Sequence, residues 1–220
     1  MMQDGVLRFR RREQISGRRT WMKNGWKETA GRLRAWLVAQ EKRLVLWANN
    51  RHLERGLRRL LGVWLRTITH AGGAIFTLVS SLAAALLAPA PWNAAGWQSL
   101  TAVTISHIPV FIVKRKVRRL RPYQALREIV TGTKKPLTDP SFPSGHTTAI
   151  CAFVIPFLAA ADARLLPLLL PAGLIVMASV GWSRIYLGLH YPTDVAAGAM
   201  IGTMTALVVT SVGWMPVQIS

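Results

Sequence analysis

The sequence predicts an all-α fold: a polytopic membrane helix bundle of about five transmembrane helices, preceded by an N-terminal amphipathic interfacial helix. Of the 220 residues, 51% are hydrophobic and 17% are charged, and the mean hydropathy is +0.27. These values are typical of a membrane protein with several spans. Uncharged runs long enough to cross a bilayer, and tryptophans at the ends of these runs, support the same fold class.

The N-terminal segment is too basic to enter a bilayer. Residues 1–66 hold 17 Lys and Arg against five acidic residues. We predict a basic tail over residues 1–31, followed over 32–62 by an amphipathic helix that can break at Asn49 and Asn50. Its apolar stripe fits a membrane interface and an ordinary packing contact equally well. At an interface, the basic residues would bind anionic lipids.

The rest of the chain, residues 63–220, is predicted to form one membrane-embedded domain. No charged residue occurs between Thr67 and Val113, which leaves room for two crossings of about 20 residues each. Pro89 and Pro91 would form the turn between these crossings. The five predicted spans cover residues 67–88, 95–113, 147–161, 165–182 and 195–214.

Three short motifs in this domain gather residues that can bind a phosphate ester. They are Lys114-x6-Arg121-Pro122, Pro143-Ser144-Gly145-His146 and Ser183-Arg184-x5-His190-x3-Asp194. With five spans, all three motifs lie at the same membrane surface, because two crossings separate the second motif from the third. The sequence therefore predicts a single site at one surface of the membrane.

The third motif has the layout of a nucleophile with its orienting partner. Pro192 is favoured in the first turn of a helix, so a helix is expected to begin near Tyr191 with Asp194 in its first turn. Asp194 can then accept a hydrogen bond from one imidazole nitrogen of His190 and leave the other nitrogen free to attack phosphorus. Arg184 offers a planar guanidinium that matches phosphate oxygens.

The second motif precedes a predicted helix, whose N-terminal N–H groups form an anion site. Ser144 can donate its hydroxyl proton, and Gly145 lets the backbone approach the anion. His146 is placed to protonate the leaving oxygen as a general acid.

The first motif adds Lys114 and Arg121 as further cations, and Pro122 is expected to end the helix before it. Such donors can stabilise the charge of a phosphoryl transition state without a metal ion. No carboxylate cluster that would hold Mg²⁺ accompanies them in the sequence. Four neighbouring cations are expected to contact lipid headgroups or to anchor the topology, and one of them could instead meet the second phosphate of a diphosphate substrate: Arg115, Lys116, Arg118 and Arg119.

These spacings resemble the three-part signature of the type 2 phosphatidic acid phosphatase superfamily, also called the lipid phosphate phosphatase and haloperoxidase superfamily. All eleven fixed positions match, and the resemblance covers roughly residues 50–215. It implies a membrane enzyme that needs no metal or other cofactor and hydrolyses lipid phosphates or diphosphates. Its substrates would be an isoprenoid diphosphate such as undecaprenyl diphosphate, phosphatidate or phosphatidylglycerophosphate.

The resemblance also implies a role for each matched residue. His190 would form a phosphohistidine, Asp194 would orient it, and His146 would be the general acid. The remaining residues would bind phosphate: Lys114, Arg121, Ser144, Gly145 and Arg184.

Three other interpretations compete with this one. A vanadate-dependent haloperoxidase shares these pocket residues, but such enzymes are soluble and the apolar spans argue against one. A catalytically dead membrane scaffold would not need the intact set of residues. Nucleic-acid binding, suggested by the net charge of +19, is disfavoured because a soluble binder would not carry so much uncharged apolar sequence.

The charge distribution predicts a multi-pass protein of the plasma (cytoplasmic) membrane with its N-terminus and its active site on the cytoplasmic side. Nearly all Lys and Arg fall on the site side, whereas the turns at 89–97 and 162–164 carry only Arg164. A cysteine at Thr133, with Cys151 removed, would test this prediction through its accessibility to an impermeant reagent.

Overall fold

The computed structural model describes residues 28–49, 55–131 and 137–212. The chain forms two compact units, Met1–Arg43 and Leu44–Ser220, and the second unit contains all three motifs. The described part of the first unit is helical, and this helix continues to residue 49. Thr133, the position chosen for the accessibility test, lies outside the described residues.

Every regular element in the described ranges is a helix, which confirms the predicted all-α fold. The predicted amphipathic helix over 32–62 corresponds to two described helices, one over 28–49 and α2, with residues 50–54 outside the described part. The labelled elements are α2 (Arg55–Ile68), η1 (Thr69–Gly72), α3 (Ala74–Leu87), α4 (Trp92–Val117), α5 (Pro122–Ala125), α6 (Gly145–Ala160), α7 (Leu166–Tyr186) and α8 (Pro192–Ser211).

Three helical segments are long and apolar enough to cross a membrane: Trp92–Ala125, Leu166–Tyr186 and Pro192–Ser211. A fourth crossing results if Arg59–Gly72 and Ala74–Leu87, which are bent by 61°, count as one broken span. α6 is apolar but has only 16 residues, in keeping with the short third run of the sequence. The number of five spans therefore stays a prediction.

The bend interrupts the run predicted as the first span. η1 ends at Gly72, and a Cβ there would lie 2.6 Å from Cγ1 of Val180 and 2.8 Å from the carbonyl oxygen of His146. Only glycine lets η1 pack this closely against the start of α6. The break thus places η1 beside the second motif.

Two further glycines let α8 pack directly on α6. A Cβ at Gly198 would lie 2.5 Å from the carbonyl oxygen of Ser144, and one at Gly202 would lie 2.3 Å from that of Thr148. The two glycines have the GxxxG spacing found where membrane helices approach closely. This contact brings the second and third motifs together.

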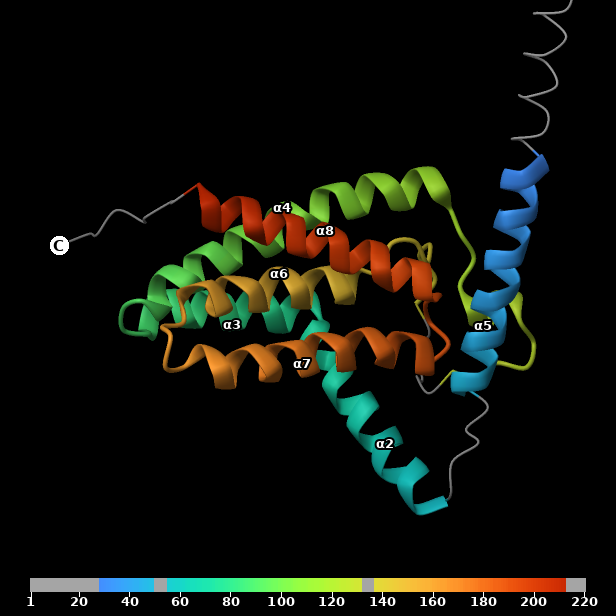
Figure 1. Cartoon of the computed structure of the whole chain (residues 1–220), viewed down its shortest axis with the longest axis horizontal. Coiled ribbons are helices and arrows are strands. Elements are labelled where there is room, and N and C mark those ends of the chain that lie inside the picture. The colour runs from blue at the N-terminus through green and yellow to red at the C-terminus, as the bar shows by residue number, and fades with distance from the viewer. Residues whose placement is uncertain (1–27, 50–54, 132–136, 213–220) are drawn as a thin grey trace, which may run out of the picture. The chain divides into compact units, whose positions relative to one another are not determined.

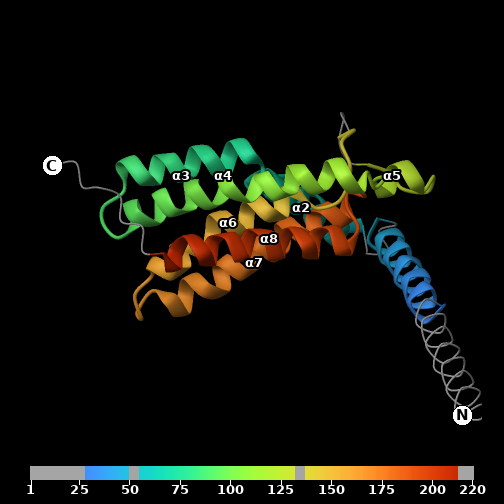
Figure 2. The ribbon, with the colours of Figure 1, turned by 90° about the horizontal axis from the view of Figure 1, so that it is seen from above.

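The site-bearing ends of the helices lie at one end of the bundle (Figures 1 and 2). α4 and α7 end there, and α6 and α8 begin there. The connections from α3 to α4 and from α6 to α7 lie at the opposite end. Helices of both directions therefore contribute to a single site.

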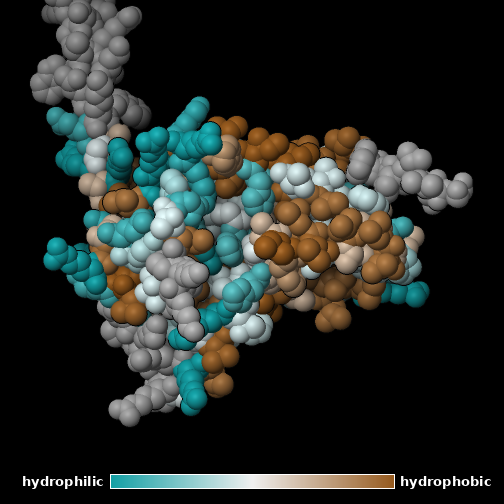
Figure 3. All heavy atoms as spheres, turned by 180° about the vertical axis from the view of Figure 1, so that it is seen from behind, coloured by the Kyte–Doolittle hydropathy of each residue, from teal (hydrophilic) through white to brown (hydrophobic). Residues whose placement is uncertain are grey.

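Much of the outer surface of these helices is apolar. Large side chains that are more than half exposed occur on several helices, among them Ile75 on α3, Ile108 on α4, Ile175 on α7 and Val208 on α8. In Figure 3 apolar side chains cover much of the visible helical face, while hydrophilic ones gather toward one end. A lipid environment accounts for this exposed apolar surface.

Candidate active site

His190 lies in the short connection between α7 and α8. Its backbone N–H donates to the carbonyl oxygen of Arg184 over 3.1 Å, and its side chain is buried. Gly188 begins this connection with a φ of +67°, a conformation that glycine adopts without strain. The tight connection therefore holds His190 next to the end of α7.

The surroundings of the His190 imidazole fix its tautomer. Nη1 of Arg121 lies 3.0 Å from Nε2, and a guanidinium can only donate. Nε2 therefore carries a lone pair, and the neutral ring carries its proton on Nδ1. Nδ1 is buried with no hydrogen-bond partner among the described residues. Nε2 is thus the ring nitrogen with a lone pair to attack phosphorus.

Asp194 is buried in the first turn of α8, and the start of that helix at Pro192 confirms the predicted boundary. Its Oδ2 accepts from the N–H of Tyr191 over 2.8 Å, and its Oδ1 pairs with Nη1 of Arg119 over 2.7 Å. Oδ2 lies 3.6 Å from Nδ1 of His190, which is too long for a hydrogen bond. The expected hydrogen bond is therefore absent from this geometry, where both carboxylate oxygens have closer donors.

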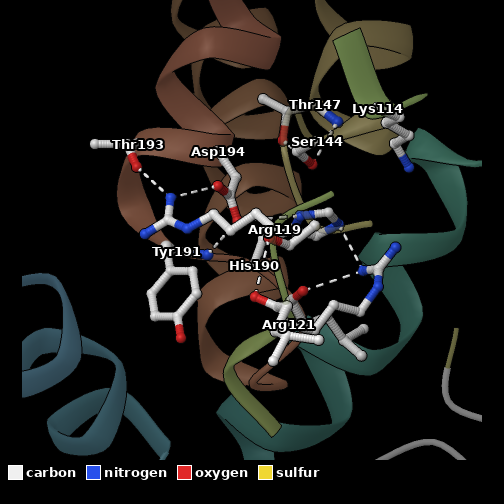
Figure 4. A network of polar contacts seen from close by, with 12 residues as sticks. Lys114, Arg119, Arg121, Ser144, Thr147, His190, Tyr191, Thr193 and Asp194 are labelled. Atoms are coloured by element: carbon white, nitrogen blue, oxygen red, sulfur yellow. Dashed lines mark hydrogen bonds and ion pairs between the residues drawn. The ribbon is translucent and has the colours of Figure 1, made fainter. Parts of the chain in front are cut away.

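Arg119 is a part of the site that sequence reasoning missed. Its Nη1 donates to Asp194 and, over 2.8 Å, to Oγ1 of Thr193, and its guanidinium lies 4.0 Å from the ring centroid of Tyr191 (Figure 4). The expectation that Arg119 contacts headgroups or anchors the topology did not include this ion pair with Asp194. Arg119 is one of several neighbouring cations in the sequence, so its position alone did not indicate a role in the site.

The chain turns sharply just before these arginines. α4 ends at Val117, and Arg118 adopts the left-handed conformation with φ 42° and ψ 38°. Contrary to the expectation, Pro122 does not end α4. It is the first residue of α5, where its missing N–H costs nothing. The turn at Arg118 directs the following segment, with Arg121, across the site.

A carboxylate joins the two cations of the first motif. Arg121 is fully buried and donates from Nε to the carbonyl oxygen of Asp139 and from Nη2 to its Oδ1, both over 2.8 Å. Oδ2 of Asp139 pairs with Nζ of Lys114. Nη1 of Arg121 also donates to the carbonyl oxygen of Leu189 over 3.0 Å. With the contact to His190, these bonds engage four of the five N–H groups of Arg121.

Arg184 has two buried nitrogens whose donors are unused. It is 3% exposed, and its Nη1 donates to Oγ1 of Thr69 in η1 over 2.9 Å. Its Nε and Nη2 are buried without a hydrogen-bond partner among the described residues. An unpaired buried donor costs about 1–3 kcal/mol, so this pair of donors suits an incoming anion. Thr69, outside the three motifs, had no sequence signal.

The second motif forms the start of α6. Ser144 is the N-cap and is buried; its Oγ accepts from the N–H and from Oγ1 of Thr147, over 3.4 and 3.0 Å (Figure 4). Its own hydroxyl proton stays available to an anion. A Cβ at Gly145 would meet nothing within 4 Å, so the space over this N-terminus is open. His146 follows in the same turn.

The charged groups of the three motifs act on one another. Burial lowers the pKa of His146 to about 2, and the charges of Arg184, Arg121 and Lys114 and the imidazole of His190 contribute to this shift. Burial lowers the pKa of His190 well below its usual value, and the charges of Arg184, Arg121 and Lys114 lower it further. The structure thus brings both predicted histidines into one cationic site, with His190 neutral.

Asp139 keeps its charge in this site. Burial raises the pKa of Asp139, but the ion pairs with Lys114 and Arg121 outweigh burial and hold it below its usual value. Within the described ranges, no group of three or more His, Cys, Asp or Glu residues is arranged to hold a metal ion.

Comparison with known proteins agrees with this arrangement. Decaprenylphosphoryl-5-phosphoribose phosphatase of Mycobacterium tuberculosis is 32% identical over 152 residues, covering 67% of this chain and 78% of that protein. Undecaprenyl-diphosphatase of Sulfolobus acidocaldarius is 32% identical over 92 residues, 42% of each chain. A transmembrane PAP2 type phosphatidylglycerolphosphate phosphatase from Bacillus subtilis has the same fold, with a TM-score of 0.64 and 22% identity over 80% of this chain and 86% of that one.

The family itself follows from a match that spans more than half of the chain. Residues 95–217 match the model of the PAP2 superfamily, and this range contains all three motifs. The resemblance noted in the sequence is thereby confirmed, and the chain belongs to the PAP2 superfamily.

Proposed function

We propose that this chain is an integral-membrane, metal-independent phosphatase that hydrolyses lipid phosphates or diphosphates through a phosphohistidine at His190. One observation carries the proposal. The lone pair on Nε2 of His190 and the two unpartnered nitrogens of Arg184, Nε and Nη2, belong to one cationic site. A nucleophile beside unsatisfied cationic donors is the arrangement that phosphoryl transfer requires.

The reaction would proceed in two steps. The negative charge of the bound phosphate would favour the protonated form of His146. Nε2 of His190 then attacks phosphorus while His146 donates its proton to the leaving oxygen, which yields a phosphohistidine and a lipid product. His146, now neutral, then accepts a proton from water as the water oxygen attacks phosphorus, and inorganic phosphate leaves. Asp194 would stabilise the positive charge that the imidazole develops.

The phosphate oxygens would be held by the cations and by the start of α6. Arg184 has the N–H groups of Nε and Nη2 for them, and Ser144 has a hydroxyl proton. The N-terminal N–H groups of α6 supply a further anion site beside Gly145. Lys114 and Arg121 would also bind the phosphate once Asp139, the carboxylate that they share, moves away from them.

The lipid tail would remain in the bilayer next to the exposed apolar faces of the helices. Two of the similar enzymes are named after decaprenyl and undecaprenyl lipids. A polyprenyl-linked phosphate or diphosphate is therefore the first substrate class to test. Phosphatidate and phosphatidylglycerophosphate come next. We also propose that the protein is a multi-pass protein of the plasma membrane, with N-terminus and site on the cytoplasmic side and anionic lipids around its basic N-terminal segment.

The test is phosphate release from these lipids by the purified protein in detergent, with and without EDTA. EDTA should leave the rate unchanged, and His190→Ala should abolish both turnover and trapped protein-bound phosphate. His107→Gln is the matched control, because His107 bonds to its own helix at Val103 away from the three motifs. A rate that depends on metal, or that survives in His190→Ala, would refute the mechanism.

A further inference from the structure

We propose that Arg119 is a positioning residue that holds the Asp194 carboxylate facing Nδ1 of the His190 imidazole. This inference rests on the proposed role of His190 as nucleophile. It concerns a residue at a variable position of the first motif, which binds the orienting partner rather than the phosphate.

The Arg119 side chain makes three contacts with the start of α8 and its N-cap. Its Nη1 reaches Oδ1 of Asp194 over 2.7 Å and Oγ1 of Thr193 over 2.8 Å. Its guanidinium stacks on the ring of Tyr191, with 4.0 Å between the guanidinium carbon and the ring centroid. The side chain is 24% exposed, so the pair is partly shielded from water. A planar guanidinium can make these contacts together, whereas an ammonium cannot.

These contacts decide how Asp194 faces the nucleophile. Arg119 engages Oδ1 and the N–H of Tyr191 engages Oδ2, so the plane of the carboxylate is fixed from both sides. In that plane, Oδ2 lies 3.6 Å from Nδ1 of His190. Since the Asp194 side chain is fully buried, loss of Arg119 would leave Oδ1 without its charged partner and free the carboxylate to rotate.

One short segment therefore reaches both sides of the imidazole. Arg121 contacts Nε2 of His190 directly, and Arg119 acts on the Nδ1 side through Asp194 (Figure 4). Leu120 between them is 61% exposed and points away, as alternate residues of an extended segment do. The left-handed turn at Arg118 sets the direction of this segment.

The location of Arg119 separates its role from phosphate binding. Its contacts described above are with residues of α8 and its N-cap, and none is with Arg184 or Lys114. Its replacement should therefore lower kcat and leave the affinity for phosphate analogues unchanged. Replacement of Arg121, which adjoins the phosphate site, should alter both.

The test compares Arg119→Gln and Arg119→Lys with the wild type. We expect kcat to fall about 10- to 100-fold in Arg119→Gln, the loss associated with one hydrogen bond between charged groups. Arg119→Lys should recover part of the rate because it retains the charge. KM and inhibition by orthovanadate should stay at the wild-type values in both variants. Arg115→Gln, the same change at an exposed residue of α4, is the control.

The pH profile gives a second measurement that a purely structural role would not move. Loss of Arg119 leaves the negative charge of Asp194 uncompensated beside His190 and favours the protonated imidazole. The acid limb of kcat/KM should therefore move to higher pH in Arg119→Gln. The groups that act on His190 and remain unchanged are Arg184, Arg121, Lys114, His146 and Asp194.

The outcomes separate the two proposals. No phosphate release or trapped phosphate in the wild type would end the proposed function itself. An active wild type with an unchanged kcat and pH profile in Arg119→Gln would overturn only the role of Arg119. A large change in vanadate inhibition would also overturn it, because Arg119 would then bind phosphate. If Arg119→Gln does not fold, Arg119→Lys carries the same comparison.

Discussion

Asp139 binds Arg121 through its side chain and its backbone at once. Its Oδ1 accepts from Nη2 and its carbonyl oxygen accepts from Nε, both over 2.8 Å. The other carboxylate oxygen pairs with Lys114, so two phosphate-binding cations of the proposed site share one internal anion. The Asp139 side chain is 45% exposed, in contrast to the fully buried Arg121, which leaves it room to move.

Replacing Asp139 with Asn should strengthen the binding of phosphate analogues. The amide oxygen and the retained backbone carbonyl still accept from Arg121, but the charge that opposes an incoming phosphate is lost. We expect the inhibition constant of orthovanadate to fall several-fold relative to wild type. Asp162→Asn, at the opposite end of the bundle, should leave it unchanged. Weaker inhibition in Asp139→Asn would show that the carboxylate supports the cations instead of competing for them.

Thr69→Val should impair substrate binding through Arg184. Valine has nearly the shape of threonine but cannot accept the 2.9 Å hydrogen bond from Nη1. A hydrogen bond to a charged group is worth about 1.5–3 kcal/mol, so kcat/KM should fall about 10-fold or more. Thr67→Val, which removes only a hydroxyl bonded to its own helix at Val63, is the control. Equal losses in both variants would contradict a specific role for Thr69.

Gly202→Val should destabilise the protein. The new side chain would collide with the carbonyl oxygen of Thr148, 2.3 Å from its Cβ, and force α8 away from α6. Overpacking of this kind costs about 1–3 kcal/mol or more, which thermal unfolding in detergent would register as a lower midpoint. Gly56→Ala, where nothing lies within 4 Å of the added Cβ, should unfold no earlier than wild type. A wild-type midpoint in Gly202→Val would refute the close contact.

Protonation of His190 should make stability depend on pH. Its pKa in the folded protein is well below the usual 6.5, so below that pH the unfolded chain binds a proton that the folded protein does not. This group therefore favours the unfolded state as the pH falls below about 6.5, and the effect is absent above it. The midpoint of thermal unfolding should drop between pH 7.5 and pH 5. His190→Asn should show a smaller drop in this midpoint. An equal drop would show that a group other than His190 causes the pH dependence.

Cysteine accessibility should report the orientation in the membrane. Glu128 is exposed in the connection that follows α5, and Ala163 is exposed in the turn between α6 and α7 at the other end of the bundle. In a background with Cys151→Ala, an impermeant thiol reagent applied to intact cells should label Ala163→Cys and spare Glu128→Cys. The opposite pattern would place the proposed site on the outer side.

The sequence was sufficient for the parts of the site that depend on local rules. A proline in the first turn of a helix fixed the start of α8, so the position of Asp194 just inside it could be predicted. The second motif, directly before the third apolar run, likewise marked the start of α6. These features need no knowledge of distant contacts.

Contacts between distant segments were not predictable in this way. Arg119 and Asp139 lie on segments without regular periodicity, and their partners are set by how α4, α7 and α8 meet. Pro122 fits both the end of one helix and the start of another, and the left-handed Arg118 decided between them. Likewise, the hydropathy of residues 67–88 shows an apolar run but not the bend at Gly72, which depends on contact with α6.

The backbone N–H of Ser144 donates to the carbonyl oxygen of Asp194 over 2.9 Å, at the point where glycines already join α6 and α8. His146, the proposed proton donor, and Asp194 therefore lie on two helices that are joined directly, which would keep them at a constant distance when a headgroup binds. Adjustment to headgroups of different size would then depend on movement of Lys114, Arg121 and Asp139, which lie on a different segment of the chain. Catalytic precision and tolerance for varied lipids would thus reside in separate pieces of the same protein.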